Sequence, residues 1–159
     1  MNAISSRFLI ALAGALALPA AAQQLSPEEV KQYLSGAGMG YARAAELNHF
    51  PGPMHVLELA DKLELSAEQR AATERLMQAH KAEARALGEK VVAAEEALAQ
   101  LFRSGQVRDR ELAQAVDEAA RLQGAYRLTH LETHRRMREL LTEQQVKRYD
   151  ALRGNHHKH

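Results

Sequence analysis

Two long stretches of helical periodicity limit this chain to few folds. From residue 66 to about residue 102, apolar and small side chains recur every three or four positions, at Leu76, His80, Ala84, Leu87, Val91, Ala94, Leu98 and Leu101. This spacing predicts one amphipathic helix over 66–102. At about 1.5 Å per residue, that helix is roughly 55 Å long. A helix of this length needs a partner along its apolar face.

A second periodic stretch supplies the partner. Residues 103–106, Arg-Ser-Gly-Gln, have the composition of a turn, and a second stripe follows at Leu112, Val116, Ala119, Gln123, Tyr126, His130, His134, Met137 and Leu141. We therefore expect two antiparallel helices, over 66–102 and 109–140, joined near Gly105. This register predicts two neighbouring pairs, Leu87 with Tyr126 and Leu98 with Val116.

A short block that recurs three times marks helix starts. It reads Leu25-Ser26-Pro27-Glu28-Glu29-Val30, Leu65-Ser66-Ala67-Glu68-Gln69-Arg70 and Leu141-Thr142-Glu143-Gln144-Gln145-Val146. In each block a hydroxyl can accept from the amide three residues later, and the Glu or Gln there can reach back to the cap. We expect three capping boxes. The leucine before the first and third caps also predicts a hydrophobic staple, with Val30 and Val146.

Composition favours helix in the rest of the chain. Ala, Leu, Glu, Gln and Arg are abundant, and runs of β-branched or aromatic residues are missing, so we expect an all-α protein. Residues 23–53 should form short helices, over 24–34 and 41–47, with Gly/Pro joins. Residues 54–153 should form the hairpin domain with a last helix from Thr142 to about Leu152. Residues 154–159 read as a His-rich disordered tail.

The first 22 residues have the pattern of a signal peptide. Arg7 precedes the apolar run 8–18, and small residues lead to an expected cleavage between Ala22 and Gln23. The run is shorter than the ~20 apolar residues that cross a bilayer, so the mature chain should lie in a periplasm without a membrane span. The chain has no cysteine to carry a lipid.

The charge balance argues against nucleic-acid binding. The whole chain has 21 basic and 20 acidic side chains, and removal of Arg7 with the leader leaves 20 of each. Proteins that bind nucleic acids generally carry more basic than acidic side chains. Gly88 and Gly124 lie inside the two long stretches, and we expect each to permit a close approach or a local bend.

These features resemble the Spy/CpxP superfamily of periplasmic proteins, which includes refolding chaperones and heavy-metal sensors. The family's repeated Leu-Thr-x-x-Gln block stands here at Leu141, Thr142 and Gln145, and with serine for threonine at Leu65, Ser66 and Gln69. The resemblance covers about residues 54–153 and leaves 38–53 as an added feature. It implies an elongated four-helix cradle, a homodimer and no enzymatic chemistry.

The resemblance also implies two kinds of binding. Chaperone members hold partly unfolded clients without ATP, and sensor members bind a divalent metal between helices and signal to a membrane partner. We expect an ATP-independent chaperone or envelope-stress adaptor that binds unfolded or membrane-associated proteins. The alternative is a heavy-metal sensor or a metal-binding resistance protein.

The sharpest chemical pattern is His130-x-x-x-His134-x-x-Met137, which places three donors on one side of a helix. If the turn is centred near Gln106, His80 stands opposite position 133 and Glu83 stands opposite His130. These five residues are candidate ligands for zinc, nickel, cobalt or copper. The competing interpretation makes the histidines ordinary stripe residues. The family's own ligand positions fall at Val56, Ala60, Met77, Thr133 and Met137, so its metal site is not inherited in place.

Other candidates lie outside the hairpin. Met39, Tyr41, Phe50 and Met54 are candidate contacts for clients, or else they pack the short helices on the hairpin. His49 and His55 flank the Pro-Gly-Pro corner as ligands or as surface residues. The tail histidines, His156, His157 and His159, either chelate metal loosely or belong to a disordered end. Motifs for phosphate binding or nucleophilic catalysis are missing, so we expect no enzyme.

Overall fold

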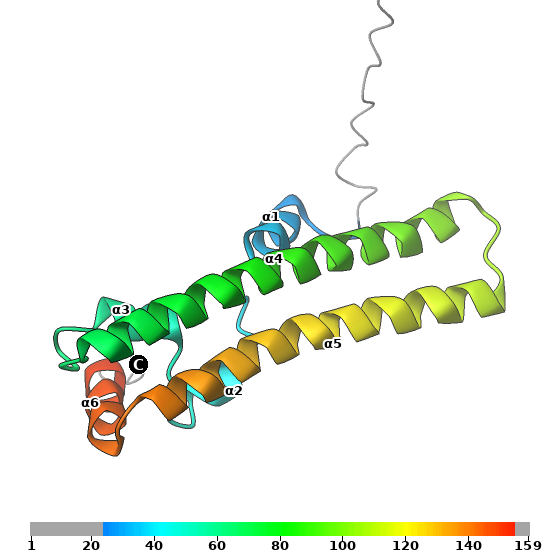
Figure 1. Ribbon diagram of the computed structural model, residues 1–159. Coiled ribbons are helices and arrows are strands. Elements are labelled where there is room, and N and C mark those ends of the chain that lie inside the picture. The colour runs from blue at the N-terminus through cyan, green and yellow to red at the C-terminus, as the bar shows by residue number, and fades with distance from the viewer. Residues whose placement is uncertain (1–23, 155–159) are drawn as a thin grey trace, which may run out of the picture.

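The computed structural model describes residues 24–154, which fold into six helices (Figure 1). The longest two, α4 (Ala67–Arg103) and α5 (Asp109–Leu140), form an antiparallel hairpin whose turn contains Gly105 at φ 67°. These bounds confirm the predicted hairpin. The described residues contain no strand, which agrees with the all-α expectation. The expected signal peptide and the tail from residue 155 lie outside the described residues.

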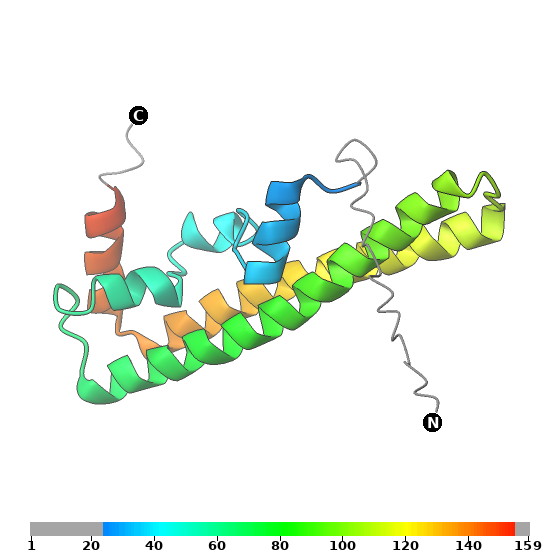
Figure 2. The same ribbon diagram turned by 90° about the horizontal axis from the view of Figure 1, so that it is seen from above.

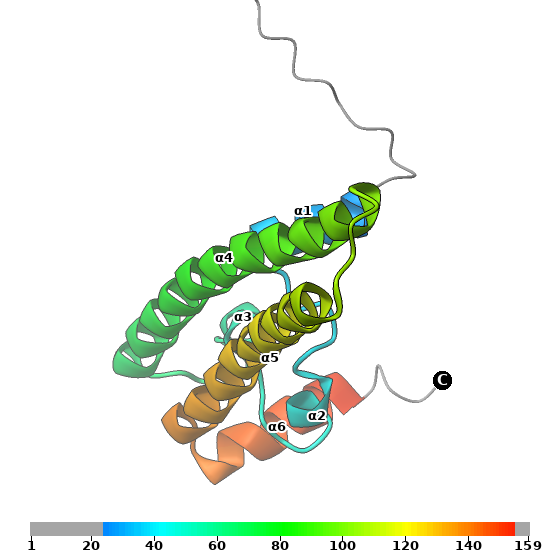
Figure 3. The same cartoon turned by 90° about the vertical axis from the view of Figure 1, so that its right-hand side faces the viewer.

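Four shorter helices accompany the hairpin. They are α1 (Pro27–Ser35), α2 (Arg43–Glu46), α3 (Pro53–Glu58) and α6 (Glu143–Gly154). Seen from above, all four lie on the same side of the hairpin (Figure 2), and the view from the turn end shows α2 and α6 beside α5 (Figure 3). The last helix ends at Gly154, two residues beyond the predicted end near Leu152. None of the helices within residues 24–154 has the length and apolar character to span a bilayer.

The three predicted capping boxes all form. The Ser26 hydroxyl accepts from the Glu29 amide, and the Ser66 hydroxyl accepts from the Gln69 amide. At the start of α6, the Thr142 hydroxyl accepts from the Gln145 amide at 3.2 Å, and the Gln145 side chain accepts from the Thr142 amide at 3.0 Å. Each cap satisfies backbone donors that a helix start leaves unpaired, which fixes where α1, α4 and α6 begin.

The first helix crosses α4 at a glycine. A Cβ at Gly88 would lie 2.0 Å from the carbonyl oxygen of Tyr33, so only glycine permits this crossing. The prediction of a close approach is confirmed at Gly88. At Gly124 a Cβ would meet no atom within 4 Å, so no close approach accounts for that glycine. The crossing buries the Tyr33 ring, which meets the Tyr126 ring edge-on at 5.0 Å.

Two buried clusters hold the molecule together. The upper cluster is centred on the α1–α4 crossing, and Leu87 packs against it, near Tyr126 as predicted; its buried members are Tyr33, Ala84, Val91, Leu122 and Tyr126. The basal cluster closes the open end of the hairpin with Val56, Leu63, Met137, Leu141, Val146 and Tyr149. The hairpin residues between the two clusters, near 77–81 and 130–134, belong to neither of them.

Candidate functional site

A pocket of about 660 Å³ occupies the space between the two clusters. Its hairpin side is formed by α4 and α5, and its other side by the segment that runs from the end of α1 through α2 to the start of α3. The lining residues that matter here are Met39, Arg43, Glu46, Leu47, Gly52, Met54, His55, Met77, His80, Lys81, His130, Thr133, His134 and Arg153.

Two histidines meet across the hairpin inside this pocket. The ring centroids of His80 on α4 and His130 on α5 are 4.6 Å apart, in an edge-to-face arrangement. His80 Nδ1 lies 3.0 Å from the Thr133 hydroxyl oxygen, which confirms the predicted register. Burial, together with the nearby His130 and His134, lowers the pKa of His80 to about 4, although the carboxylate of Glu83 opposes this shift.

The second histidine of the pair is almost fully buried. His130 is 4% exposed, and its Nδ1 donates to the Tyr126 carbonyl at 2.9 Å. Burial and the nearby His134 lower the pKa of His130, whereas the backbone groups of Tyr126, Gly36 and Ala37 raise it. Nε2 is buried and has no partner at a hydrogen-bonding distance and angle. Such an orphaned nitrogen is costly unless something else binds it.

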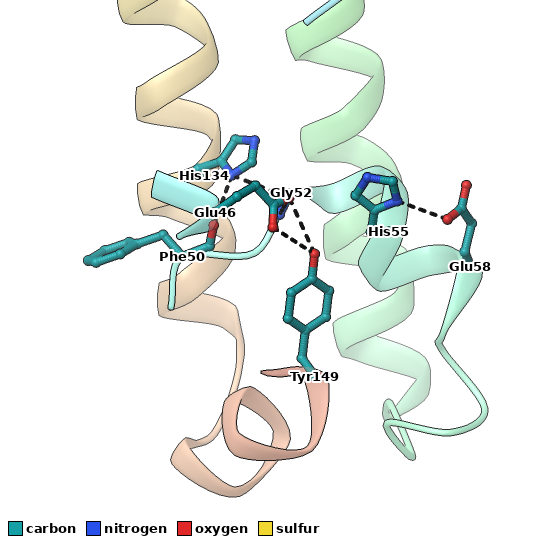
Figure 4. Close-up of polar contacts among 7 residues, drawn as sticks. All are labelled: Glu46, Phe50, Gly52, His55, Glu58, His134 and Tyr149. Atoms are coloured by element: carbon teal, nitrogen blue, oxygen red, sulfur yellow. Dashed lines mark hydrogen bonds and ion pairs between the residues drawn. The ribbon is translucent and has the colours of Figure 1, made fainter. Parts of the chain in front are cut away.

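A third histidine is fixed by the corner between α2 and α3. His134 Nδ1 lies 2.9 Å from the Phe50 carbonyl oxygen. A Cβ at Gly52 would lie 2.8 Å from Cε1 of the same ring, so the missing side chain leaves room for the imidazole (Figure 4). Glu46 holds this corner, because it accepts from the Gly52 amide at 3.2 Å and from the Tyr149 hydroxyl at 3.0 Å.

A fourth histidine lines the pocket from α3. His55 Nδ1 lies 2.9 Å from a carboxylate oxygen of Glu58, one turn along the same helix (Figure 4). The sequence left His55 either as a ligand or as a surface residue, because the fold that brings it to the hairpin is not visible in periodicity.

The partners of these rings assign their tautomers. The acceptors facing Nδ1 are backbone carbonyls for His130 and His134 and a carboxylate for His55, and none of these can donate. The Thr133 hydroxyl donates to the Thr129 carbonyl at 2.8 Å, so it accepts from His80. In the neutral state, therefore, all four rings carry hydrogen on Nδ1 and a lone pair on Nε2.

The predicted metal ligands divide into two groups. His80, His130 and His134 line the pocket together, whereas Glu83 is exposed on α4 and does not line it. Met137 is fully buried in the basal cluster, away from the pocket lining. Among the described residues, no three His, Asp or Glu side chains are arranged to hold one metal ion. Met77, one turn before His80, lines the pocket and was not named as a ligand candidate by the donor pattern.

The four predicted client contacts lie in different surroundings. Met39 and Met54 line the pocket, and Met54 is 49% exposed. Phe50 is 38% exposed, with its side chain directed away from the ring of His134 (Figure 4). Tyr41 packs instead, because its hydroxyl lies 2.9 Å from that of Tyr33 and its ring meets Tyr126 at 5.7 Å.

Comparisons of the chain with protein-family models, with curated proteins and with solved structures found no match. The site therefore has to be interpreted from its own chemistry.

Proposed function

We propose that this protein is an ATP-independent binding protein of the periplasm, of the Spy/CpxP type, that holds apolar segments of unfolded or membrane-associated client proteins. It acts by binding, without catalysis, and as a homodimer. The Leu-Thr-x-x-Gln blocks, the helical hairpin between them and the expected export signal support this proposal.

One surface carries the proposal. Leu47, Phe50 and Met54 are 53%, 38% and 49% exposed within eight residues of each other, and we call them the corner patch. Two of them, Leu47 and Met54, also line the pocket. Exposed large apolar side chains that gather in one place are typical of interaction sites. A methionine in such a place adapts to partners of irregular shape, because its side chain is flexible and polarisable.

The test is suppression of aggregation. The purified protein, without nucleotide, should reduce light scattering by a chemically denatured client in proportion to its concentration. Leu47→Asp with Met54→Asp should weaken this suppression, because charge on the corner patch opposes contact with apolar segments.

A matched variant controls for the added charge. Leu128→Asp changes an apolar residue of similar exposure, 54%, on α5. It should leave the suppression unchanged. If the wild type does not reduce scattering even in excess, the client-binding proposal fails; if both variants lose suppression equally, the corner patch is not the contact surface.

A second candidate function is metal binding, and one observation favours it. Three of the predicted ligands, His80, His130 and His134, line one pocket, and Nε2 of His130 is buried there without a partner. Calorimetric titration with zinc, nickel, cobalt and copper tests this function in the full chain with the tail histidines replaced by alanine. Binding of any metal that is lost in His80→Gln with His130→Gln supports it, and absence of binding refutes it.

A further inference from the structure

The soft donors of the chain gather around one pocket. The described residues contain the histidines 49, 55, 80, 130 and 134, and only His49 does not line the pocket. They contain the methionines 39, 54, 77 and 137, and only Met137 does not line it. Helical periodicity does not require this, because these side chains come from α3, α4, α5 and the joins between shorter helices. Imidazole nitrogen and thioether sulphur are therefore the main donors available to a ligand here.

The backbone supports the same grouping. Met39 has φ 47°, in the left-handed region that residues with side chains rarely adopt. Its neighbour Gly38 lies against the His130 ring, since a Cβ there would meet Cδ2 at 3.8 Å. Met39 is thus held in a disfavoured backbone conformation next to Gly38, and such conformations persist where the surroundings enforce them, often at functional sites.

The histidines are already prepared as ligands. Each of the four has Nδ1 occupied by a carbonyl, hydroxyl or carboxylate oxygen, which leaves Nε2 as the free lone pair. A metal-bound histidine almost always donates its other ring hydrogen to such an acceptor, which fixes the ring and raises its basicity. His80 and His130 meet from opposite helices, and Met77 lies one turn before His80 on α4.

The charges of the lining select among metals. Arg43, Lys81 and Arg153 carry positive charge there, and Glu46 is the one carboxylate of the lining. Glu46 is also engaged by the Gly52 amide and the Tyr149 hydroxyl. A divalent ion would meet net positive charge with almost no anionic ligand, whereas a monovalent ion is repelled less.

We infer that the pocket binds monovalent copper through Nε2 of His80 and His130 and the thioether of Met77. Thioether sulphur is a soft ligand that suits monovalent copper. The inference rests on the metal-binding candidate above and names its metal. It adds Met77 to the ligands and removes Glu83, His134 and Met137 from them.

The test is an anaerobic titration with monovalent copper against a chromophoric copper chelator. The protein is the full chain with His156, His157 and His159 replaced by alanine, so that the tail cannot chelate. We expect one ion per chain. Met77→Leu keeps the volume of the side chain and removes the sulphur, and it should lower the affinity by about tenfold or more. His130→Gln should lower it by at least as much, with circular dichroism as the check on folding.

Two control variants match these changes outside the pocket. Met137→Leu removes a thioether from the basal cluster, and His49→Ala removes an imidazole that bonds Asp150. Both should bind copper as the parent does. X-ray absorption at the copper edge should show sulphur together with nitrogen in the loaded parent, and loss of the sulphur signal in Met77→Leu.

The outcomes separate the two ideas. Unchanged copper affinity in Met77→Leu and His130→Gln, or a copper spectrum without sulphur, overturns the copper site. If zinc or nickel binds in a manner that depends on His80 and His130 while copper does not, the metal-binding function stands and the copper inference falls. If no metal binds, both fall, and the client-binding proposal is judged by light scattering alone.

Discussion

The side-chain amides of Gln69 and Gln145 exchange two hydrogen bonds across the base of the hairpin. Nε2 of Gln69 donates to Oε1 of Gln145 at 2.8 Å, and Nε2 of Gln145 donates back at 2.9 Å. Each Oε1 also accepts from the amide of its own cap residue, at 3.0 Å in both cases. Each Nε2 makes a second bond to a backbone carbonyl, that of Leu140 or that of Leu63. The two Leu-x-x-x-Gln blocks are therefore partners of each other.

This pairing predicts an asymmetry between glutamine and glutamate. Glutamate completes a capping box as well as glutamine does, but it cannot donate. Gln69→Glu should lower the free energy of unfolding by about 2 kcal/mol, because the oxygens of Gln145 and Leu140 lose their donor. Glu29→Gln, at the unpaired and exposed box of α1, should change it by less than about 0.5 kcal/mol. Urea denaturation measures both, and equal effects would contradict the pairing.

Alanine substitutions at the two glycines inside the long helices should change stability in opposite directions. Alanine in a helix interior is ordinarily more stable than glycine by about 1 kcal/mol. Gly124→Ala should show that gain, since a Cβ there meets nothing within 4 Å. Gly88→Ala should instead destabilise the protein, because the Cβ would collide with the Tyr33 carbonyl and push α1 away. Thermal unfolding of the two variants beside the wild type decides the matter; a gain at both positions would place α1 elsewhere.

Acid should destabilise the fold through His80. The pKa of this imidazole falls from 6.5 to about 4 in the folded state, mainly because it is buried. Between these values the unfolded chain binds a proton that the folded chain does not, so the free energy of unfolding decreases as the pH falls through this range. The buried His130 shifts in the same direction. Urea denaturation between about pH 7 and about pH 5 should give a steeper decline for wild type than for His80→Gln; parallel declines would exclude His80 as a source.

The last helix should depend on one hydroxyl. The Tyr149 ring is 2% exposed, and its hydroxyl donates to Glu46 at 3.0 Å, which links α6 to the corner between α2 and α3. Tyr149→Phe keeps the ring in the basal cluster and removes this bond, so it should cost about 1 kcal/mol of stability. Chemical denaturation measures the loss, and Glu46→Gln, which still accepts from the hydroxyl, should cost less. If Tyr149→Phe left the free energy of unfolding unchanged, this hydrogen bond would contribute nothing to stability.

Periodicity predicted the hairpin well because its determinants are local. The bounds of α4 and α5, the three capping boxes and the level of His80 opposite Thr133 all follow from spacing along the chain and one turn. The pocket was not predictable in this way. It exists because the residues from 36 to 55 fold back on one side of the hairpin, and this docking depends on contacts distant in sequence, such as Tyr33 on Gly88.

The same limit explains the uneven outcome for the site residues. His130, His134 and Met137 all lie on the apolar stripe of α5. The periodic pattern alone does not tell which of these side chains contacts residues 36–56 and which packs near α6. Met137 packs with Val56 and Tyr149 in the basal cluster. Met77 shares a face with His80, three positions later, and that spacing was the available signal for its place in the pocket.

The docking of the short helices makes the site conditional. The backbone hydrogen bonds of residues 36–56 are made within that segment, with the end of α1 and with the residues that follow in and after α3. Side chains fasten the segment to α5, such as the Tyr126 hydroxyl, which donates to the Ala37 carbonyl. Local opening of residues 36–56 therefore removes one wall of the pocket, while the backbone hydrogen bonds of α4 and α5 remain intact. Occupancy of the pocket is therefore linked to this opening equilibrium: a bound ligand slows amide exchange in 36–56, and the long helices exchange as before.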